Sequence, residues 1–320
     1  MVEGQKLQKI LVTGGAGFIG SNLVDALLST GKYSICVLDN FSTGHRSNLL
    51  HCQSDIELIE GDIRDMEIVE SAVEGVNAIF HEAALPSVPR SIKAPITSNA
   101  VNVDGTLNLL SAACKAGVSR FIMASSSSVY GDTPTLPKDE SMTPCPMSPY
   151  AVTKLTGEHY LRVFAQLYGL ETLAIRYFNV FGPRQDPNSQ YSGVIAKYMT
   201  AALSGSTYVV NGDGQQARDF TYIENVVDAN LRALRAESLH GEVINVACGK
   251  KYTLLDLIDA INEAAGVNLP VEYKSPRPGD VKYSLAAIAR AQELLGYQPS
   301  VTFSEGVKKT LEWYAANSER

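Results

Sequence analysis

Basic residues are in the minority in this chain of 320 residues. Its 27 Lys and Arg stand against 34 Asp and Glu, which gives a formal net charge of −7. A protein of this balance has no overall positive field with which to hold nucleic acid or an anionic membrane surface. We therefore expect neither nucleic acid nor a membrane as a partner, and any anionic ligand must be held by local groups.

Cysteine is scarce as well. The cysteines are odd in number, widely scattered and contain no C-x-x-C pair, which argues against a disulfide framework and a zinc site. None of the five histidines stands at a metal-ligand spacing. The sequence therefore predicts reduced thiols and no metal. The five cysteines are Cys36, Cys52, Cys114, Cys145 and Cys248.

Long apolar runs are missing. No stretch approaches the roughly 18 consecutive apolar residues of a transmembrane helix. The polar residues 1–9 run straight into an apolar strand and lack the apolar core of a signal peptide. We therefore expect a cytoplasmic protein.

Short apolar runs are the main pattern that the chain does have. Such runs are typical of buried parallel strands, and amphipathic stretches between them, such as Asn102–Ala116 and Ala151–Tyr168, are typical of helices. This alternation predicts an α/β fold, a doubly wound parallel sheet of the Rossmann type. The strand-like runs are Lys9–Thr13, Ser34–Leu38, Ile56–Ile59, Ala78–Phe80, Phe121–Met123, Thr172–Ile175 and Val243–Val246.

A glycine motif lies between the first predicted strand and the first predicted helix. Gly15, Gly17 and Gly20 satisfy G-x-G-x-x-G, in which glycine permits a tight turn and lets the backbone approach a pyrophosphate at the helix N-terminus. An ordinary glycine-rich turn is the alternative. Asp39, about 20 residues further on, can bind the ribose hydroxyls of NAD and repel the additional phosphate of NADP. The two features together predict an NAD site.

Tyr150 and Lys154 are four residues apart and therefore lie on one helical face. A free Tyr has a pKa of about 10, and a nearby cation favours its phenolate, which can then act as a base. The hydroxyl cluster Ser125–Ser128 follows a predicted strand, at the end that faces the ligand crevice of such a sheet. Solvated helix faces and serine-rich loops are the alternative explanations for these two features.

Taken together, the glycine motif, the serine cluster and the Tyr/Lys pair resemble the extended short-chain dehydrogenase/reductase family across essentially the whole chain. Five further segments are similar to those of UDP-hexose 4-epimerases. The run Leu85–Ser91 and the stretch 181–188 are most like those of the subgroup acting on UDP-N-acetylglucosamine. The five segments are Gly61–Asp65, His81–Ala84, Arg176–Gly182, Arg218–Phe220 and Arg277–Asp280.

The resemblance implies an NAD-dependent interconversion of UDP-N-acetylglucosamine and UDP-N-acetylgalactosamine, and possible action on UDP-glucose and UDP-galactose, through a 4-keto sugar. It assigns catalysis to Tyr150 as base, to Lys154, and to Ser126 or Ser127 on the sugar oxygen. The implied NAD-binding residues are Gly14, Gly17, Phe18, Ile19, Gly20, Asp39, Asn40, Ser42, Thr43, Gly44, Asp62, Ile63, Ala83, Ala84, Asn102, Tyr150, Lys154 and Tyr177.

For the substrate, the resemblance makes Arg218 and Arg277 the diphosphate clamps, since a guanidinium can chelate phosphate oxygens. Asp280 would hold the uridine ribose. Ser284 would border the C2 substituent of the sugar, where a small residue admits an N-acetyl group. Ser284 has an alternative role as the N-cap of a helix at 285–295. If the match to the family is shifted by one residue, Tyr283 would lie beside the C2 substituent instead. The other implied substrate contacts are Ser87, Ser126, Tyr150, Asn179, Tyr208 and Asn211.

A length of 320 residues, at about 150 residues per domain, predicts one large α/β domain or two closely joined ones. The Pro- and Gly-rich loops that begin after Asn179 favour a separate C-terminal lobe. The predicted NAD-binding domain comprises residues 1–179 and a segment at about 219–249 that returns to the sheet. The predicted nucleotide-sugar lobe is smaller and comprises about 180–218 and 250–320. A homodimer is the usual arrangement of the family. The helices at 106–116 and 151–168 could form its interface, although core packing explains an apolar helix face equally well.

Two other kinds of protein fit part of this pattern. Nucleotide-sugar 4,6-dehydratases and uronate decarboxylases share the first oxidation but need another acid or base after the catalytic hydroxyl, where this chain has Ser126–Val129 without a carboxylate. Uronate epimerases belong to the same wider group. A non-catalytic NAD-binding regulatory protein is the alternative from a different class, and the intact Tyr150 and Lys154 argue against it.

Overall fold

The computed structural model describes residues 7–186, 194–275 and 282–317. The chain divides into two compact units. Unit 1 comprises Met1–Val129, Pro146–Arg176 and Ala229–Ile244, and unit 2 comprises Tyr130–Cys145, Tyr177–Asp228 and Asn245–Arg320.

A seven-stranded sheet forms the centre of unit 1, in the order β11-β6-β5-β4-β1-β2-β3. The five strands from β3 to β5 in this order pair in parallel. All seven predicted strands are present, and β11 shows that the chain does return to the sheet, as the sequence predicts. The strands are β1 (Gln8–Thr13), β2 (Tyr33–Asp39), β3 (Ile56–Glu60), β4 (Ala78–His81), β5 (Arg120–Ser126), β6 (Glu171–Tyr177) and β11 (Glu242–Val246).

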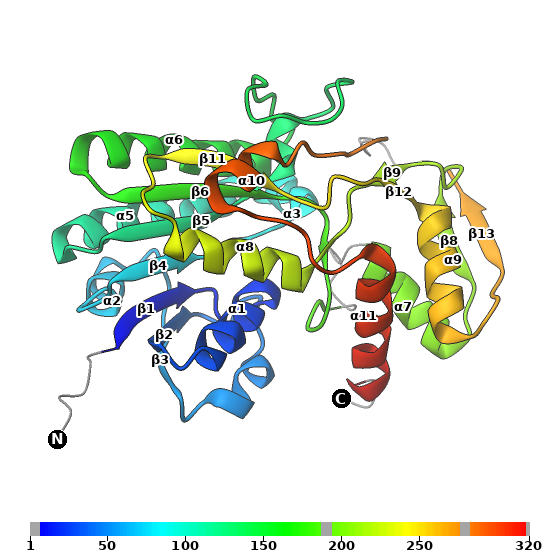
Figure 1. Cartoon of the computed structure of the whole chain (residues 1–320), viewed down its shortest axis with the longest axis horizontal. Coiled ribbons are helices and arrows are strands. Elements are labelled where there is room, and N and C mark those ends of the chain that lie inside the picture. Colours follow the sequence, from blue (N-terminus) through cyan, green and yellow to red (C-terminus); the bar gives the residue numbers. More distant parts are fainter. Residues whose placement is uncertain (1–6, 187–193, 276–281, 318–320) are drawn as a thin grey trace. The chain divides into compact units, whose positions relative to one another are not determined.

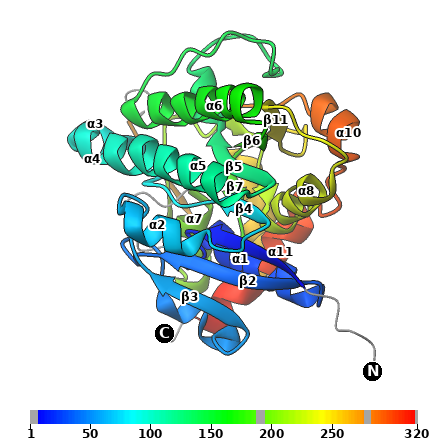
Figure 2. The same ribbon diagram turned by 90° about the vertical axis from the view of Figure 1, so that its left-hand side faces the viewer.

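Helices cover both faces of this sheet, which confirms the doubly wound α/β fold. Figure 2 shows α2, α5 and α6 together on one face and α1 on the other. The predicted helix at 102–116 begins with a π-helical turn, Ala100–Asp104, that leads into α5. The helices of this unit are α1 (Phe18–Ser29), α2 (Met66–Ala72), α3 (Val88–Lys93), α4 (Pro95–Asn99), α5 (Gly105–Ala116) and α6 (Pro149–Tyr168), with short 3-10 turns at Arg46–Asn48, Leu50–Cys52 and Ser127–Tyr130.

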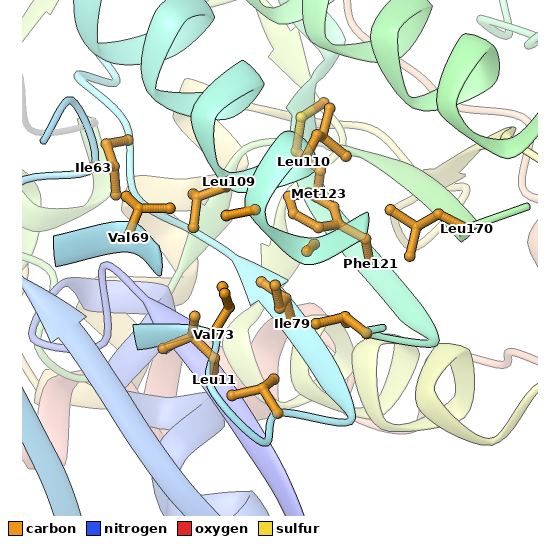
Figure 3. Packing of buried hydrophobic residues seen from close by; sticks show 14 of the residues in the cluster. Leu11, Ile63, Val69, Val73, Ile79, Leu109, Leu110, Phe121, Met123 and Leu170 are labelled. Carbon is orange, nitrogen blue, oxygen red and sulfur yellow. The ribbon is translucent and has the colours of Figure 1, made fainter. Parts of the chain in front are cut away.

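The main apolar core of unit 1 lies between the sheet and the α2/α5/α6 layer (Figure 3). Leu11, Ile79 and Phe121 point from β1, β4 and β5 toward Val69 of α2 and Leu109 of α5, and all five are fully buried. Because side chains alternate across a strand, their neighbours Ile10, Phe80 and Ile122 are buried on the opposite face. These strands are therefore buried on both faces, as expected for a parallel sheet covered by helices.

Unit 2 contains three small two-stranded sheets, β7 with β10, β9 with β12, and β8 with β13. Figure 1 shows α9 beside β8 and β13. Among the described residues, no helix is long and apolar enough to cross a membrane. The elements are β7 (Val180–Phe181), α7 (Val194–Ser204), β8 (Tyr208–Asn211), β9 (Ala217–Arg218), β10 (Thr221–Tyr222), α8 (Ile223–Arg235, which runs on into unit 1), β12 (Tyr252–Thr253), α9 (Leu254–Ala265), β13 (Val271–Lys274), α10 (Ala289–Leu295) and α11 (Phe303–Asn317).

The segment Tyr130–Cys145 belongs to unit 2, whereas the sequence pattern placed it in the first domain. The cause is pairing over a long sequence distance. Lys138 donates its N–H to the Leu285 carbonyl and accepts from the Ala287 N–H. The side-chain amide of Asn245 donates to the carbonyls of both Lys138 and Ala287.

The same pairing corrects the expected helix at 285–295. Helix α10 begins only at Ala289. The N–H groups of Ser284 and Ala287 are bonded to the carbonyls of Ala217 and Lys138, so this stretch cannot continue the helix backwards. Ser284 is therefore not a helix N-cap.

Candidate active site

The turn between β1 and α1 has the geometry that the glycine motif predicts. Gly14 has φ +70°, and its N–H donates to the Leu38 carbonyl at 2.9 Å. A Cβ on Gly20 would lie 2.2 Å from the carbonyl oxygen of Gly14, so no side chain fits there. Gly17 is the N-cap of α1 and, having no side chain, supplies no cap. The N-terminus of α1 can therefore receive a phosphate group on its backbone N–H donors.

Asp39 ends β2 beside this turn. Its carboxylate accepts from the N–H groups of Ala16 at 2.9 Å and Phe41 at 2.8 Å. Burial raises the pKa of the Asp39 carboxyl, and the two N–H donors oppose that shift. Each carboxylate oxygen has a second lone pair, which leaves room for ribose hydroxyl donors. The arrangement therefore fits the ribose of a nicotinamide dinucleotide.

The loop Asn40–Gly44, which contains Ser42 and Thr43, is packed against the same turn. A Cβ on Gly44 would lie 2.8 Å from the backbone of Ala16. The side-chain amide of Asn40 donates to Asp62 at 2.7 Å. A bidentate contact with Arg64 keeps the pKa of Asp62 at about 2, so this carboxylate is ionised at neutral pH. The side chain of Ile63 is buried in the core and leaves only its backbone for an adenine contact.

The loop after β4 touches the glycine turn directly. A Cβ on Gly14 would lie 2.6 Å from the backbone nitrogen of Ala83, next to Ala84. Below this contact, the His81 ring bonds to Thr13 and Thr106, each at 2.8 Å. Burial lowers the pKa of His81 to about 3, so the ring is neutral and joins β1, β4 and α5.

Asn102, a predicted NAD contact, lies in the π-helical turn. Its side chain accepts from the N–H of Leu85 at 2.8 Å and donates to Thr153 of α6 at 3.0 Å. Asn102 therefore holds the loop after β4 against the first turns of α6. A π-helical turn places an additional residue in a helix and often marks a functional position.

Tyr150, Lys154 and Ser126 come together at the carboxyl end of β5. The Tyr150 hydroxyl is hydrogen-bonded to Ser126, and Lys154 Nζ donates to the Ala124 carbonyl at 2.8 Å. The N–H of Tyr150 donates to Ser91 Oγ of α3 at 3.0 Å, which fixes the start of α6. The structure thus brings the three predicted side chains, Tyr150, Lys154 and Ser126, to the same end of β5. Ser127 lies one residue further on, in the 3-10 turn.

Burial controls the charges of this group. It raises the pKa of Tyr150 to about 12, and the hydrogen bond from Ser126 opposes the shift. It lowers the pKa of Lys154 to about 8, against the charges of Glu82 and Glu158. The sequence pattern did not point to either glutamate, although Glu82 directly follows β4 and Glu158 stands four residues after Lys154.

Several predicted substrate residues lie close together within unit 2. The guanidinium of Arg218 donates to the carbonyls of Ala217 at 3.0 Å and Lys282 at 3.1 Å. Ser284 donates its N–H to the same Ala217 carbonyl at 2.9 Å. Asn179, with φ +38°, donates to the carbonyl of Asp219 at 3.1 Å. The structure thus brings three predicted residues to one short backbone segment.

The other residues predicted to contact substrate or NAD lie in different parts of the structure. Tyr208 is fully buried, with its hydroxyl on Asn262 at 3.0 Å, so the structure gives no support to its predicted contact with substrate. Asn211 ends β8, the strand that Tyr208 begins, and Tyr177 ends β6 and is buried. Ser87 is the N-cap of α3 and accepts from Arg90. Arg277 and Asp280 lie outside the described residues.

One group of possible metal ligands lies outside the predicted site. Asp25, His51 and Cys52 bring their ligand atoms within 4.8 Å of one another. His51 Nε2 and Asp25 Oδ1 are hydrogen-bonded at 2.7 Å. The sequence pattern did not predict this group because Asp25 comes from α1 and the other two residues from a separate 3-10 turn.

Comparisons with known proteins agree with this geometry. Residues 10–247 match the model of the NAD dependent epimerase/dehydratase family. The chain is 40% identical over 315 residues to a UDP-glucose 4-epimerase of Mycolicibacterium smegmatis, a match that covers 97% of this chain and 100% of that protein.

Two solved structures are similar over nearly the whole chain. One is the UDP-N-acetylglucosamine 4-epimerase of Methanobrevibacter ruminantium in complex with UDP-N-acetylmuramic acid, with 39% identity, a TM-score of 0.93, and coverage of 98% of this chain and 100% of that one. The other is the UDP-glucose 4-epimerase of Thermotoga maritima with UDP-glucose, with 38% identity, a TM-score of 0.92, and coverage of 97% and 100%.

The first testable prediction concerns Asp39. Asp39→Asn removes the negative charge that would repel the 2′-phosphate of NADP but keeps a hydrogen-bond acceptor for the turn. We expect the ratio of NADP to NAD affinity, measured by titrating the cofactor-free protein, to rise about tenfold or more. Asp25→Asn, on the adjacent helix, is the control and should leave the ratio unchanged. An unchanged ratio in Asp39→Asn would remove Asp39 from the ribose site.

Proposed function

Because the chain belongs to the NAD dependent epimerase/dehydratase family, we propose that it is a UDP-hexose 4-epimerase that interconverts UDP-N-acetylglucosamine and UDP-N-acetylgalactosamine, and also UDP-glucose and UDP-galactose. NAD is its cofactor. The observation that carries the proposal is the contact of Ser126 with Tyr150, one helical turn from Lys154, at the carboxyl edge of the sheet. This edge, next to the switch in strand order between β1 and β4, is where doubly wound sheets bind their ligands.

The glycine turn, Asp39 and the α1 N-terminus would hold NAD, and their donors and acceptors fit its pyrophosphate and ribose. Bound NAD supplies a reversible hydride acceptor for C4 of the sugar. Burial raises the pKa of Tyr150 to about 12, so the positive charges of Lys154 and of the bound nicotinamide would have to lower it; Tyr150 would then take the proton of the C4 hydroxyl, and Ser126 would hydrogen-bond the same oxygen. Since the pKa of Lys154 is about 8, its positive charge is present at neutral pH, favours the Tyr150 phenolate, and is lost as the pH rises above that value.

Inversion needs the flat 4-keto sugar to present its other face before Tyr150 returns the proton. A grip on the nucleotide diphosphate is therefore more useful than a tight fit to the sugar. We assign that grip to Arg218 and Arg277, with Asp280 on the uridine ribose and Asn179 on the diphosphate or the sugar. The preference for an N-acetylated sugar is supported by the small side chain of Ser284 and by the run Leu85–Ser91.

The runner-up functions are less well supported. A 4,6-dehydratase or a uronate decarboxylase needs a further acid or base after the catalytic hydroxyl, and the residues after Ser126 are Ser127, Ser128 and Val129. A uronate 4-epimerase differs only in its substrate, so UDP-glucuronate belongs in the assay. A regulatory protein without catalysis would have no need of the assembled contact of Tyr150 with Ser126.

The second prediction is that Tyr150→Phe loses turnover. Purified wild type should convert UDP-N-acetylglucosamine to its galacto isomer, seen by the anomeric NMR signals. The variant lacks the proton acceptor, so its kcat should fall by about 10²–10⁴-fold while UDP-sugar binding, measured by calorimetry, is retained. Tyr168→Phe, at the exposed end of α6, is the matched control and should keep full activity. A Tyr150→Phe variant with a wild-type rate would show that another group is the base.

A third prediction tests Ser284 as the residue beside the C2 substituent. Ser284→Tyr should lower kcat/KM for UDP-N-acetylglucosamine by about a hundredfold or more relative to that for UDP-glucose, because the added ring takes the space of the acetyl group. Tyr283→Ser is the control for the neighbouring position and should not reduce the ratio. If the ratio is unchanged in Ser284→Tyr, or wild type refuses the N-acetylated sugar, the substrate preference is that of a UDP-glucose 4-epimerase.

We also propose a homodimer formed through α6. This helix exposes Val152, Val163 and Leu167, and α3 and α4 pack beside it with Ile92 and Ile96 exposed. Leu167 and Ile96 are 73% and 85% exposed, which is high for large apolar side chains.

The fourth prediction follows from this face. Leu167→Glu places a charge in the proposed interface, so light scattering should show half the wild-type mass. Leu50→Glu, at a site that is also exposed but lies in a separate 3-10 turn, should keep the wild-type mass. A wild type of monomer mass, or a dimer that survives Leu167→Glu, contradicts the proposed interface.

A further inference from the structure

One buried carboxylate ties α6 to the carboxyl ends of two strands. Glu158 accepts from Arg176 of β6 through Nε at 2.9 Å and Nη2 at 2.7 Å. It also accepts from the hydroxyl of Ser125 in β5. The side chains of Arg176 and Glu158 are only 3% and 4% exposed. None of these three residues has a role in the chemistry proposed above.

The position of this ion pair is more informative than its contribution to stability. A buried ion pair is costly to desolvate, and apolar residues of the same volume often stabilise a fold as well or better. The same two strands carry a second pair at their amino ends, Arg120 with Glu171, where the side chains are 11% and 31% exposed. The pair that is fully buried is the one at the reactive edge of the sheet.

Three consecutive residues at the end of β5 contact α6 at successive turns. The Ser126 hydroxyl meets Tyr150, the Ala124 carbonyl accepts from Lys154, and the Ser125 hydroxyl donates to Glu158. The three α6 residues stand four apart and therefore on one face of the helix. A sliding or rotation of α6 would disturb all three contacts at once.

On the basis of the proposed function, we propose that Glu158 is a positioning residue. By holding Ser125 and Arg176 together, it fixes the α6 turn that carries Lys154 and keeps Ser126 and Tyr150 in contact with each other. Glu158 does not touch the reacting atoms in this proposal. It acts on them through the placement of Lys154, Ser126 and Tyr150.

The charges around Lys154 give the proposal a measurable consequence. Glu82 and Glu158 face it with negative charge and raise its pKa, whereas burial lowers it. Arg176 balances Glu158, the neutral ring of His81 interacts with Lys154 from β4, and Tyr150 lies one turn away. Neutralising Glu158 removes one stabilising charge and leaves Arg176 without that carboxylate. Both changes lower the pKa of Lys154.

The fifth prediction compares Glu158→Gln with Glu171→Gln. Glu158→Gln should lower kcat by about tenfold to a hundredfold, with KM within about twofold of wild type, because misplacement affects the reacting geometry more than binding. The alkaline limb of its pH–rate profile should move to lower pH by about one pH unit. Glu171→Gln breaks the pair at the other end of the strands, so any loss should be confined to Tm, with kcat and the pH profile unchanged.

The pKa of Lys154 can also be measured directly, without an activity assay. The Nζ signals of isotope-labelled lysines can be titrated by NMR, with Lys154 identified by its absence in Lys154→Arg. In Glu158→Gln the Lys154 titration should move to lower pH, and in Glu171→Gln it should not. Should Glu158→Gln fail to fold, Ser125→Ala removes only one donor and should still lower kcat several-fold at constant KM.

Three results would overturn the proposal. The first is a Lys154 titration that is the same in Glu158→Gln as in wild type. The second is an equal loss of kcat in Glu171→Gln, which would mean that general destabilisation is the cause. The third is a wild-type kcat in Ser125→Ala. A wild type with no turnover of any UDP-hexose would instead refute the proposed function, and the NMR titration would still test the role of Glu158.

Discussion

The close approach of two backbones at the carboxyl edge of the sheet is the constraint on which the site depends. The turn after β1 and the loop after β4 lie so near each other that a Cβ on Gly14 would be 2.6 Å from the nitrogen of Ala83. At this point the strand order changes direction, since β1 lies between β2 and β4. The glycines of the turn between β1 and α1 thus allow this turn, the loop after β4 and the end of β5 to lie close together. The His81 contacts with Thr13 and Thr106 hold the strands beneath this point.

Burial lowers the pKa of two groups near this edge, His81 and Lys154, with different consequences. It makes His81 a neutral structural group with a pKa of about 3. It also brings the pKa of Lys154 down to about 8, near the range in which a change of charge affects reactivity. Most of the difference is already present in the ordinary pKa values of the two side chains, 6.5 for His and 10.5 for Lys; the charge of Lys154 further lowers the pKa of His81, whereas the carboxylates Glu82 and Glu158 support the charge of Lys154. One apolar core therefore provides both a rigid frame and a reactive group.

The sequence predicted what depends on local pattern. Short apolar runs identified all seven strands of the main sheet, and glycine spacing located the turn before α1. The four-residue spacing of Tyr150 and Lys154 placed both on one helical face, and the serine cluster together with the family resemblance placed that face beside the end of β5. These features are determined by residues close together in the chain, where periodicity and steric limits act directly.

Contacts between distant residues could not be predicted in this way. Glu158 joins Ser125 and Arg176 across three different elements, and no spacing rule connects them. Residues 130–145 joined unit 2 because Lys138 pairs with Leu285 and Ala287, more than a hundred residues later in the chain. The π-helical turn that places Asn102 between Leu85 and Thr153 also has no sequence pattern of its own. The roles of Arg277 and Asp280 stay predictions from the sequence.

The most direct test of the central claim is to follow epimerisation of UDP-N-acetylglucosamine in D₂O by NMR. If Tyr150 removes the proton of the C4 hydroxyl, and never the hydrogen on C4 itself, solvent has no route to that carbon. The galacto product should therefore form with protium at C4. A product that carries solvent deuterium at C4 would mean that a base removes the carbon-bound hydrogen as a proton, and it would contradict the proposed role of Tyr150.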